Sequence, residues 1–160
     1  MLRKILAISL LLCLCVSCDE NITSPVPLAK VSLKFSLVYD KQSYDNLNKG
    51  ALHYVIANQE TIRPLKETDF FGCNGLLLIV NINNQTTFPV DIKAYDLYCP
   101  NDGATISPDN PVDTETATCP KCKEQYYVGD GGYPLKGSKY RLKSYNVYYN
   151  ETTNVYIVTN

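Results

Sequence analysis

Short stretches in which apolar and polar residues alternate recur along the chain. Residues 31–37 (VSLKFSL) and 88–98 (FPVDIKAYDLY) place apolar side chains at alternate positions over most of their length. This period of two predicts strands with one buried face, because successive side chains of a strand point to opposite sides. Residues 76–82 (LLLIVNI) are almost continuously apolar, which predicts a strand buried on both faces or at the centre of a sandwich.

The remaining segments favour the same fold class. Residues 51–57 (ALHYVIA) form a short apolar run that favours a strand over a helix, and the polar residues 40–50 predict a loop. Further strand-like pieces follow at 114–118, 125–128, 143–149 and 153–158. The last two pieces predict a closing hairpin. No stretch has the pattern of a long amphipathic helix, so the sequence predicts an all-β domain with many short strands.

The first residues of the chain have the pattern of an export signal. Arg3 and Lys4 precede the apolar run 5–14, which is too short to cross a bilayer stably. We therefore expect residues 1–17 to be a signal peptide that is removed. No later apolar run approaches the length of a membrane span.

Residues 15–18 (CVSC) resemble the cleavage motif of bacterial lipoproteins, in which the cysteine after the cut is acylated. We expect Cys18 to be this lipidation site, and the alternative is plain secretion with cleavage after Ser17. Several acyl chains hold a protein stably on a membrane. Residues 18–28, with two prolines, predict an extended lipid-anchored tether. The expected location is the Gram-negative outer membrane, facing the periplasm or, because residues 19–20 (DE) resemble a surface-export signal, the cell surface.

The charge of the chain argues against a nucleic-acid partner. The sequence has 15 basic and 16 acidic residues. Loss of Arg3 and Lys4 with the signal peptide leaves 13 basic residues against 16 acidic ones, a net charge of −3. No basic stripe or basic patch with interleaved aromatic residues is present to neutralise phosphates.

Two short motifs, CPND and CPKC, contain most of the candidate metal-binding residues of this sequence. Each has the two-residue spacing with which zinc-ribbon and rubredoxin-like turns point two side chains at one metal. Cys99, Asp102, Cys119 and Cys122 thus form a candidate tetrahedral ligand set for zinc or iron. Cys73 is an alternative fourth ligand in place of Asp102.

From about Gly72 onward the order of features resembles a Rieske domain. The features are a glycine-bounded turn before the apolar run, a strand ending in CPNDG, CPKC with a following aromatic residue, a glycine-rich loop, and a final hairpin. The resemblance covers roughly the last 90 residues and implies that residues 29–160 form a Rieske-like antiparallel β-sandwich. It also implies a small rubredoxin-like or zinc-ribbon-like ligand subdomain at about residues 95–130.

The ligand pattern of the Rieske family differs from this sequence. In that family two cysteines bind one iron of a 2Fe–2S cluster and two histidines bind the other. Cys99 and Cys119 match the cysteine positions, whereas Asn101 and Cys122 stand at the histidine positions. His53, the only histidine, cannot replace two ligands. A Rieske centre with two histidines is therefore excluded in this chain alone.

Three interpretations of the site remain at the level of sequence. In the first, the scaffold has lost its cluster, and the cysteines are free or include one disulfide, with Cys73 as a candidate partner. In the second, one zinc or iron ion is bound by the tetrahedral set. In the third, a 2Fe–2S cluster without histidine ligands is held by the three cysteines 99, 119 and 122 together with Asn101 or Asp102.

The sequence shows no pattern of catalytic residues and predicts a binding or structural accessory of the cell envelope instead of an enzyme. The alternative is a metal-bearing protein, either an electron carrier or a domain stabilised by its metal. The chain has 13 tyrosines, 4 phenylalanines and no tryptophan. These tyrosines are expected to line strand faces. A second interpretation is an exposed aromatic surface for a protein or glycan partner, with Tyr145, Tyr148 and Tyr149 as candidates.

Overall fold

A computed structural model describes residues 25–84 and 88–160 of the 160-residue chain. The expected signal peptide, Cys18 and the first part of the tether lie outside the described residues. The strands are β1 (Val31–Phe35), β2 (Tyr54–Ala57), β3 (Phe70–Phe71), β4 (Leu76–Val80), β5 (Ile92–Asp96), β6 (Ser107–Pro108), β7 (Thr116–Thr118), β8 (Gln125–Tyr127), β9 (Tyr133–Pro134), β10 (Ser144–Asn150) and β11 (Val155–Thr159). Two short helical turns, α2 (Lys41–Tyr44) and η2 (Asp45–Lys49), lie between β1 and β2.

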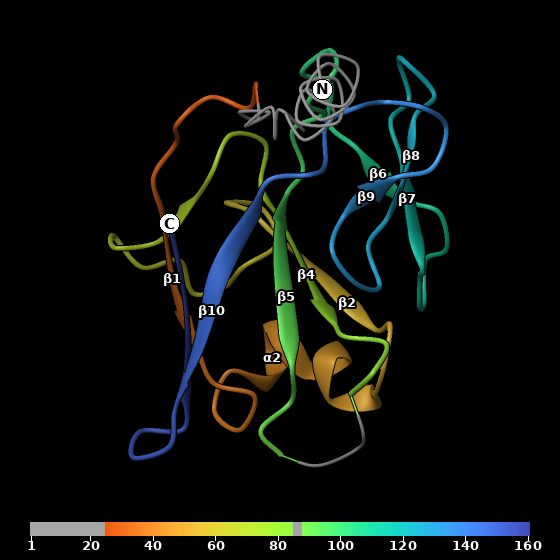
Figure 1. Ribbon diagram of the computed structural model, residues 1–160. Helices are drawn as coiled ribbons and strands as arrows, with labels where there is room; N and C mark the ends of the chain where they lie inside the picture. Colours follow the sequence, from red (N-terminus) through yellow and green to blue (C-terminus); the bar gives the residue numbers. More distant parts are fainter. Residues whose placement is uncertain (1–24, 85–87) are drawn as a thin grey trace, which may run out of the picture.

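Seven of the strands form one antiparallel sheet in the order β2-β4-β5-β10-β11-β1-β3. This sheet curls into a nearly closed, barrel-like shape (Figure 1). The other four strands form a smaller antiparallel sheet in the order β6-β7-β8-β9. The prediction of an all-β fold built from antiparallel strands is confirmed, and the predicted closing hairpin is the pair β10 and β11. The barrel-like curl is not visible in the alternation of residues along the chain.

Strand β4 separates two hydrophobic cores, and all five of its residues are buried. Leu76, Leu78 and Val80 face the first core, whereas Leu77 and Ile79 face the second. Both faces of this strand are thus apolar because each face is covered, which is the physical reason for the uninterrupted run of apolar residues. The prediction of a strand buried on both sides is confirmed.

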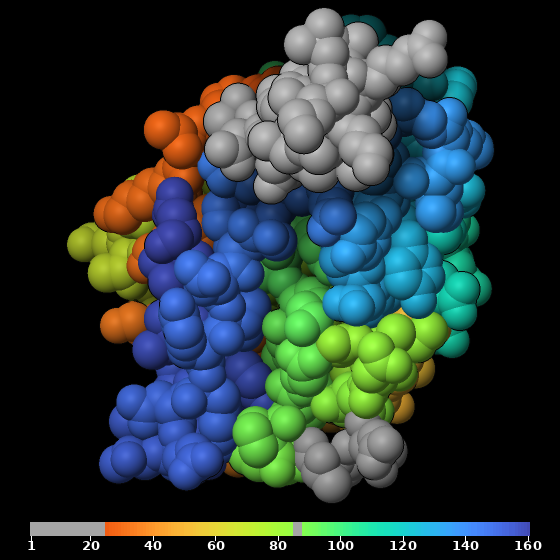
Figure 2. All heavy atoms as spheres, in the orientation of Figure 1, coloured from red at the N-terminus to blue at the C-terminus, as the bar shows by residue number. Residues whose placement is uncertain are grey.

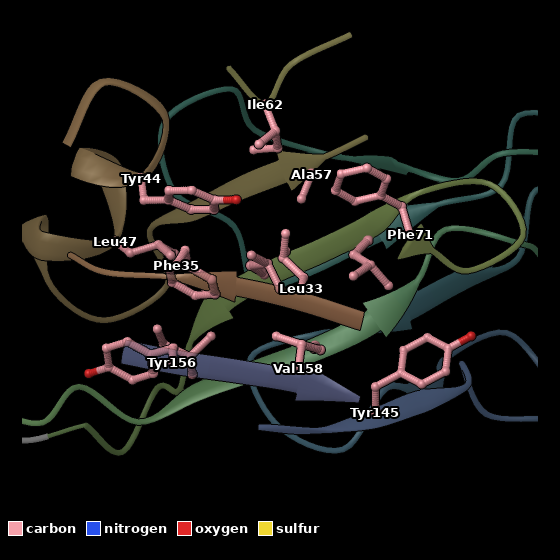
Figure 3. Close-up of a cluster of buried hydrophobic side chains, with 14 of the residues drawn as sticks. Leu33, Phe35, Tyr44, Leu47, Ala57, Ile62, Phe71, Tyr145, Tyr156 and Val158 are labelled. Carbon is pink, nitrogen blue, oxygen red and sulfur yellow. The ribbon is translucent and has the colours of Figure 1, made fainter. Parts of the chain in front are cut away.

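The first core fills the interior of the large sheet (Figure 3). The ring of Phe35 stacks on those of Tyr44 and Tyr156, with centroids 4.2 and 5.4 Å away. Tyr44 and Leu47 belong to α2 and η2, so these turns close one end of the core. The prediction that residues 40–50 form a plain loop was wrong, because two buried side chains three positions apart favour a helical turn. Among the described residues no helix is long and apolar enough to span a membrane.

The second core lies between the large sheet and the small one. It is made of buried residues from β4, β5, the small sheet and the connections between them. Cys99 and Cys119 belong to it, and both are fully buried. Figure 2 shows the lighter blue residues that include β8 and β9 packed beside the green residues of β5. Two of the candidate metal-binding cysteines therefore lie where the two sheets meet.

The exposed aromatic surface predicted on the last hairpin is only partly present. Tyr145 is 8% exposed, and its hydroxyl donates a hydrogen bond of 2.8 Å to the carboxylate of Asp96. Its predicted exposure was wrong, because Tyr145 pairs with Ala94 of β5 and points into the first core. Tyr149 is half-buried against that core, whereas Tyr148 is 56% exposed.

Candidate metal centre

The first side of the candidate site is a tight turn at residues 99–103. It follows β5, and the carboxylate of Asp96 accepts a 2.8 Å hydrogen bond from the N–H of Tyr98, next to the turn. The N–H of Gly103 donates to the carbonyl of Cys99 at 2.9 Å, and the N–H of Cys99 donates to the carbonyl of Ala104 at 2.9 Å. Gly103 has a φ of +76°, a conformation that glycine adopts without a steric cost.

The second side is a turn at residues 119–123 that repeats this arrangement. The N–H of Lys123 donates to the carbonyl of Cys119 at 3.1 Å, and the N–H of Cys119 donates to the carbonyl of Glu124 at 2.9 Å. Lys123 stands where the first turn has Gly103, and its φ is +62°. We call residues 99–103 and 119–123 the two knuckles.

Each knuckle presents its first and fourth side chains to the same point. The donor atoms of Cys99, Asp102, Cys119 and Cys122 all lie within 4.8 Å of one another. The sulfurs of Cys99 and Cys122 are 3.7 Å apart, and the sulfur of Cys119 is 3.5 Å from both carboxylate oxygens of Asp102. The two first residues are buried, Asp102 is half-buried, and Cys122 is exposed.

These spacings fit a single tetrahedral ion. Zinc binds cysteine sulfur at about 2.3 Å and carboxylate oxygen at about 2.0 Å. In a tetrahedron with those bond lengths, two sulfurs are about 3.8 Å apart, and a sulfur and an oxygen are about 3.5 Å apart. The observed contacts of 3.7 and 3.5 Å match both values. These two contacts thus have the separations that one ion requires, and the remaining donor pairs lie within 4.8 Å.

Hydrogen bonds from neighbouring groups stabilise the negative charge of the candidate ligands Asp102 and Cys122. The N–H of Ala104 donates to the Asp102 carboxylate at 2.9 Å and, as the largest influence, lowers the pKa of that carboxyl group. Partial desolvation raises the pKa of the Cys122 thiol, but hydrogen bonds from the N–H of Glu124 and from Asn101 outweigh it and lower the pKa. Both fourth-position side chains are therefore biased towards the anionic form, which is the form that binds metals.

Cys99 has a different environment because it is buried. Its burial raises the pKa of the thiol, and hydrogen bonds from the backbone N–H of Asn101 and the hydroxyl of Tyr126 oppose this effect. The hydroxyl oxygen of Tyr126 is 3.6 Å from the sulfur. A buried sulfur with a raised pKa favours either the neutral thiol or a cation that compensates the thiolate charge.

Asn101 borders the site as a hydrogen-bond donor. Its side-chain nitrogen is 3.6 Å from the sulfur of Cys122 and 3.4 Å from the hydroxyl of Tyr126. Its side-chain oxygen accepts a 2.8 Å hydrogen bond from the hydroxyl of Ser138. The amide thus turns N–H groups towards the sulfur, and its oxygen, the better metal ligand, is already engaged by Ser138.

Glu124 holds the loop that carries Ser138, and sequence analysis did not identify either residue. The Glu124 side chain is buried and accepts hydrogen bonds from the N–H groups of Leu135, Lys136 and Ser138 at 3.1, 2.6 and 2.9 Å. Burial raises the pKa of Glu124, but these and other backbone hydrogen bonds outweigh it and lower the pKa. No local motif marks such a carboxylate, since its partners lie more than ten residues along the chain.

The structure does not bring Cys73 or His53 into the group of four. The sulfur of Cys73 donates to the carbonyl of Pro27 at 3.5 Å, and its backbone N–H donates to the Asp96 carboxylate at 2.9 Å. The ring of His53 lies 3.3 Å from the carbonyl of Ala51. All four described cysteines are free thiols, so no disulfide joins Cys73 to the knuckles.

Comparison of the chain with models of known protein families, with curated proteins and with solved structures finds no match. The resemblance to Rieske domains therefore stays a prediction. What the site does is inferred from its own residues.

Proposed function

We propose that the protein holds one metal ion between the two knuckles, bound by Cys99, Asp102, Cys119 and Cys122, and that the ion is Zn²⁺. The observation that supports this proposal most is the gathering of four donor atoms within 4.8 Å of one another, with the two contacts of 3.7 and 3.5 Å matching a single tetrahedron. Three soft thiolates with one carboxylate suit zinc, which accepts sulfur and oxygen ligands in tetrahedral geometry.

A mononuclear ion fits the site better than a 2Fe–2S cluster. Such a cluster takes two ligands on each of two irons, so its ligands divide into two pairs at opposite ends. Here all four donors lie within 4.8 Å of one another. Asn101, the cluster ligand that the sequence offered as an alternative, has its side-chain oxygen engaged by Ser138.

The role of the ion is structural. Four protein ligands complete a tetrahedron and leave no position for a substrate or water, which is the mark of a structural zinc site. The first knuckle follows β5 of the large sheet and the second joins β7 to β8 of the small one. The ion therefore clamps the two sheets together beside the second core.

This clamp belongs to a Rieske-like antiparallel β domain on a lipid-anchored envelope protein, a binding or structural accessory instead of an enzyme. Cys18 anchors the chain to the outer membrane, on its periplasmic or outer face. Its partners are the membrane, through that anchor, and a protein or glycan ligand of the domain. Its net charge of −3 after loss of residues 1–17 gives no attraction for nucleic acid.

The test is metal analysis with a visible spectrum, on the full chain produced with zinc and iron both available. We expect about one zinc per chain and no visible absorbance. The Cys122→Ser variant should lose the zinc, and the Cys73→Ser variant, a matched control outside the ligand group, should keep it.

A different metal content would contradict the proposed zinc site. One iron with a red colour indicates a rubredoxin-like electron carrier. Two irons with labile sulfide indicate a cluster without histidine ligands. Absence of metal in the freshly purified protein refutes the proposal and supports a metal-free scaffold with free or disulfide-bonded cysteines.

A further inference from the structure

We propose that Cys99 and Cys122 form a disulfide with each other when the protein meets a disulfide oxidant, and that this bond displaces the metal. The release of metal depends on the proposed function. The formation of the disulfide does not, because it needs only the two thiols.

The two sulfurs are already in contact. They lie 3.7 Å apart and come from different knuckles. A disulfide has an S–S length of about 2.05 Å, so the sulfurs must approach by about 1.7 Å. Cys122 is exposed in a surface turn, whereas Cys99 is buried. The third sulfur, on Cys119, is buried and also lies 3.5 Å from the carboxylate of Asp102.

The exposure of each thiol determines which one reacts first with the oxidant. Cys122 is the thiol of the group that a soluble oxidant reaches, since Cys99 and Cys119 are both buried. The Cys122 thiolate attacks an external disulfide, forms a mixed disulfide and releases one external thiolate. The Cys99 thiolate then attacks the Cys122 sulfur and releases the second external thiolate. Two protein thiolates are thus oxidised, and one external disulfide is reduced to two thiolates.

The new bond takes two of the four ligands from the metal. Cys119 and Asp102 alone do not complete a tetrahedron, so the ion leaves. The disulfide joins the same two knuckles that the ion joined. A covalent link therefore replaces the metal clamp, and the two sheets stay connected in the oxidised state. Exported proteins encounter disulfide oxidants of this kind, so export of the chain would supply the oxidant that the exchange requires.

The test treats the metal-loaded full chain with oxidised glutathione and follows two quantities together. Peptide mapping without reduction identifies the linked cysteines, and a chromogenic chelator measures free metal. We expect the Cys99–Cys122 linkage and the release of metal to appear at the same rate, and a dithiol plus metal to reverse both. The Cys73→Ser variant, changed at a cysteine outside the site, should behave like the unchanged protein.

A second experiment keeps the two proposals separable. The Cys119→Ser variant lacks one ligand of the proposed site but retains both reacting thiols, so it should still form the Cys99–Cys122 linkage. The metal-free oxidised protein should also unfold roughly 5–10 °C above the metal-free reduced protein, because a cross-link restricts the unfolded chain.

Three results would overturn the inference. They are a Cys119–Cys122 linkage within one knuckle, an oxidised protein in which Cys99 and Cys122 remain thiols, and oxidation that leaves the metal bound. If the purified protein holds no metal but the Cys99–Cys122 linkage forms, the proposed function has failed and the disulfide stands.

Discussion

The two knuckles have the same backbone and different side chains. In both, the first residue is a buried cysteine, the second is proline, and the fifth residue has a left-handed conformation that closes the turn with an N–H to the first carbonyl. The fourth residue is Asp102 in one turn and Cys122 in the other, and the fifth is Gly103 in one and Lys123 in the other. The hydrogen-bonded turn therefore positions the donors, and the identity of the donor varies within it.

The first and fourth residues of each turn have different roles. Cys99 and Cys119, the first residues, are packed in the second core, where neighbouring side chains hold their positions. The fourth residues close the site from the solvent side, because Asp102 is half-buried and Cys122 is exposed. Changes at first positions should therefore disturb folding as well as metal binding, whereas changes at fourth positions should act mainly on the metal.

The largest expected effect comes from removing a first-position ligand. Cys119→Ala should weaken zinc binding by more than about 100-fold, beyond what is typical for residues outside the ligand set. It should also lower the stability of the metal-free protein, because it leaves a gap in the second core. Competition with a chelator measures the first effect, and urea unfolding of the reduced, metal-free protein measures the second. Cys122→Ala is the comparison: it should lose the metal but leave metal-free stability nearly unchanged, and an equal loss in both would contradict the division of roles.

Exchanging the fourth-position ligand should make the knuckles alike. Asp102→Cys completes a four-thiolate site and should tighten zinc binding by about 10-fold or more, since thiolate is the softer ligand. In the cobalt-substituted protein, thiolate-to-metal absorption should rise relative to the unchanged chain. Asp102→Ala should weaken binding instead. If both substitutions leave affinity unchanged, Asp102 is not a ligand.

The fifth positions should respond with opposite signs. Gly103→Ala should destabilise the reduced, metal-free protein by at least about 1–2 kcal/mol, because φ is +76° and the added methyl group would lie 2.7 Å from the Tyr98 hydroxyl. Lys123→Gly should stabilise it by about 0.5–1 kcal/mol, because glycine relieves the cost of a left-handed lysine. Urea unfolding of both variants measures the difference. Changes of the same sign would mean that the two turns are not equivalent when the metal is absent.

The smallest effect is expected around the sulfur of Cys122. Asn101→Ala removes an N–H donor to this sulfur and should weaken zinc binding by about 10-fold. Ser138→Ala removes only the hydroxyl that orients this amide, so its effect should be smaller. Chelator competition resolves the two. A larger loss for Ser138→Ala than for Asn101→Ala would show that the loop, and not the amide, supports the metal.

Sequence reasoning succeeded where a feature depends on neighbours along the chain. The apolar run of β4 identified a strand buried on both faces, and the closing hairpin was predicted from two strand-like stretches and the turn between them. CPND and CPKC identified the four residues that come together, because each motif folds into a turn closed by its own hydrogen bonds. The helical turns within residues 40–50 were not predicted, because they depend on the burial of Tyr44 and Leu47 against strands elsewhere.

Only the tertiary structure decided the features that join distant segments. The hydroxyl of Ser138 meets Asn101 across 37 positions of the chain, and Glu124 binds a loop more than ten residues away. The inward position of Tyr145 depends on the pairing of β10 with β5. Sequence alone left both Asp102 and Cys73 as a fourth ligand, and the fold separated them by placing Cys73 beside Pro27. Local hydrogen bonds determine the shape of each knuckle, but only packing between the sheets brings the two knuckles to one point.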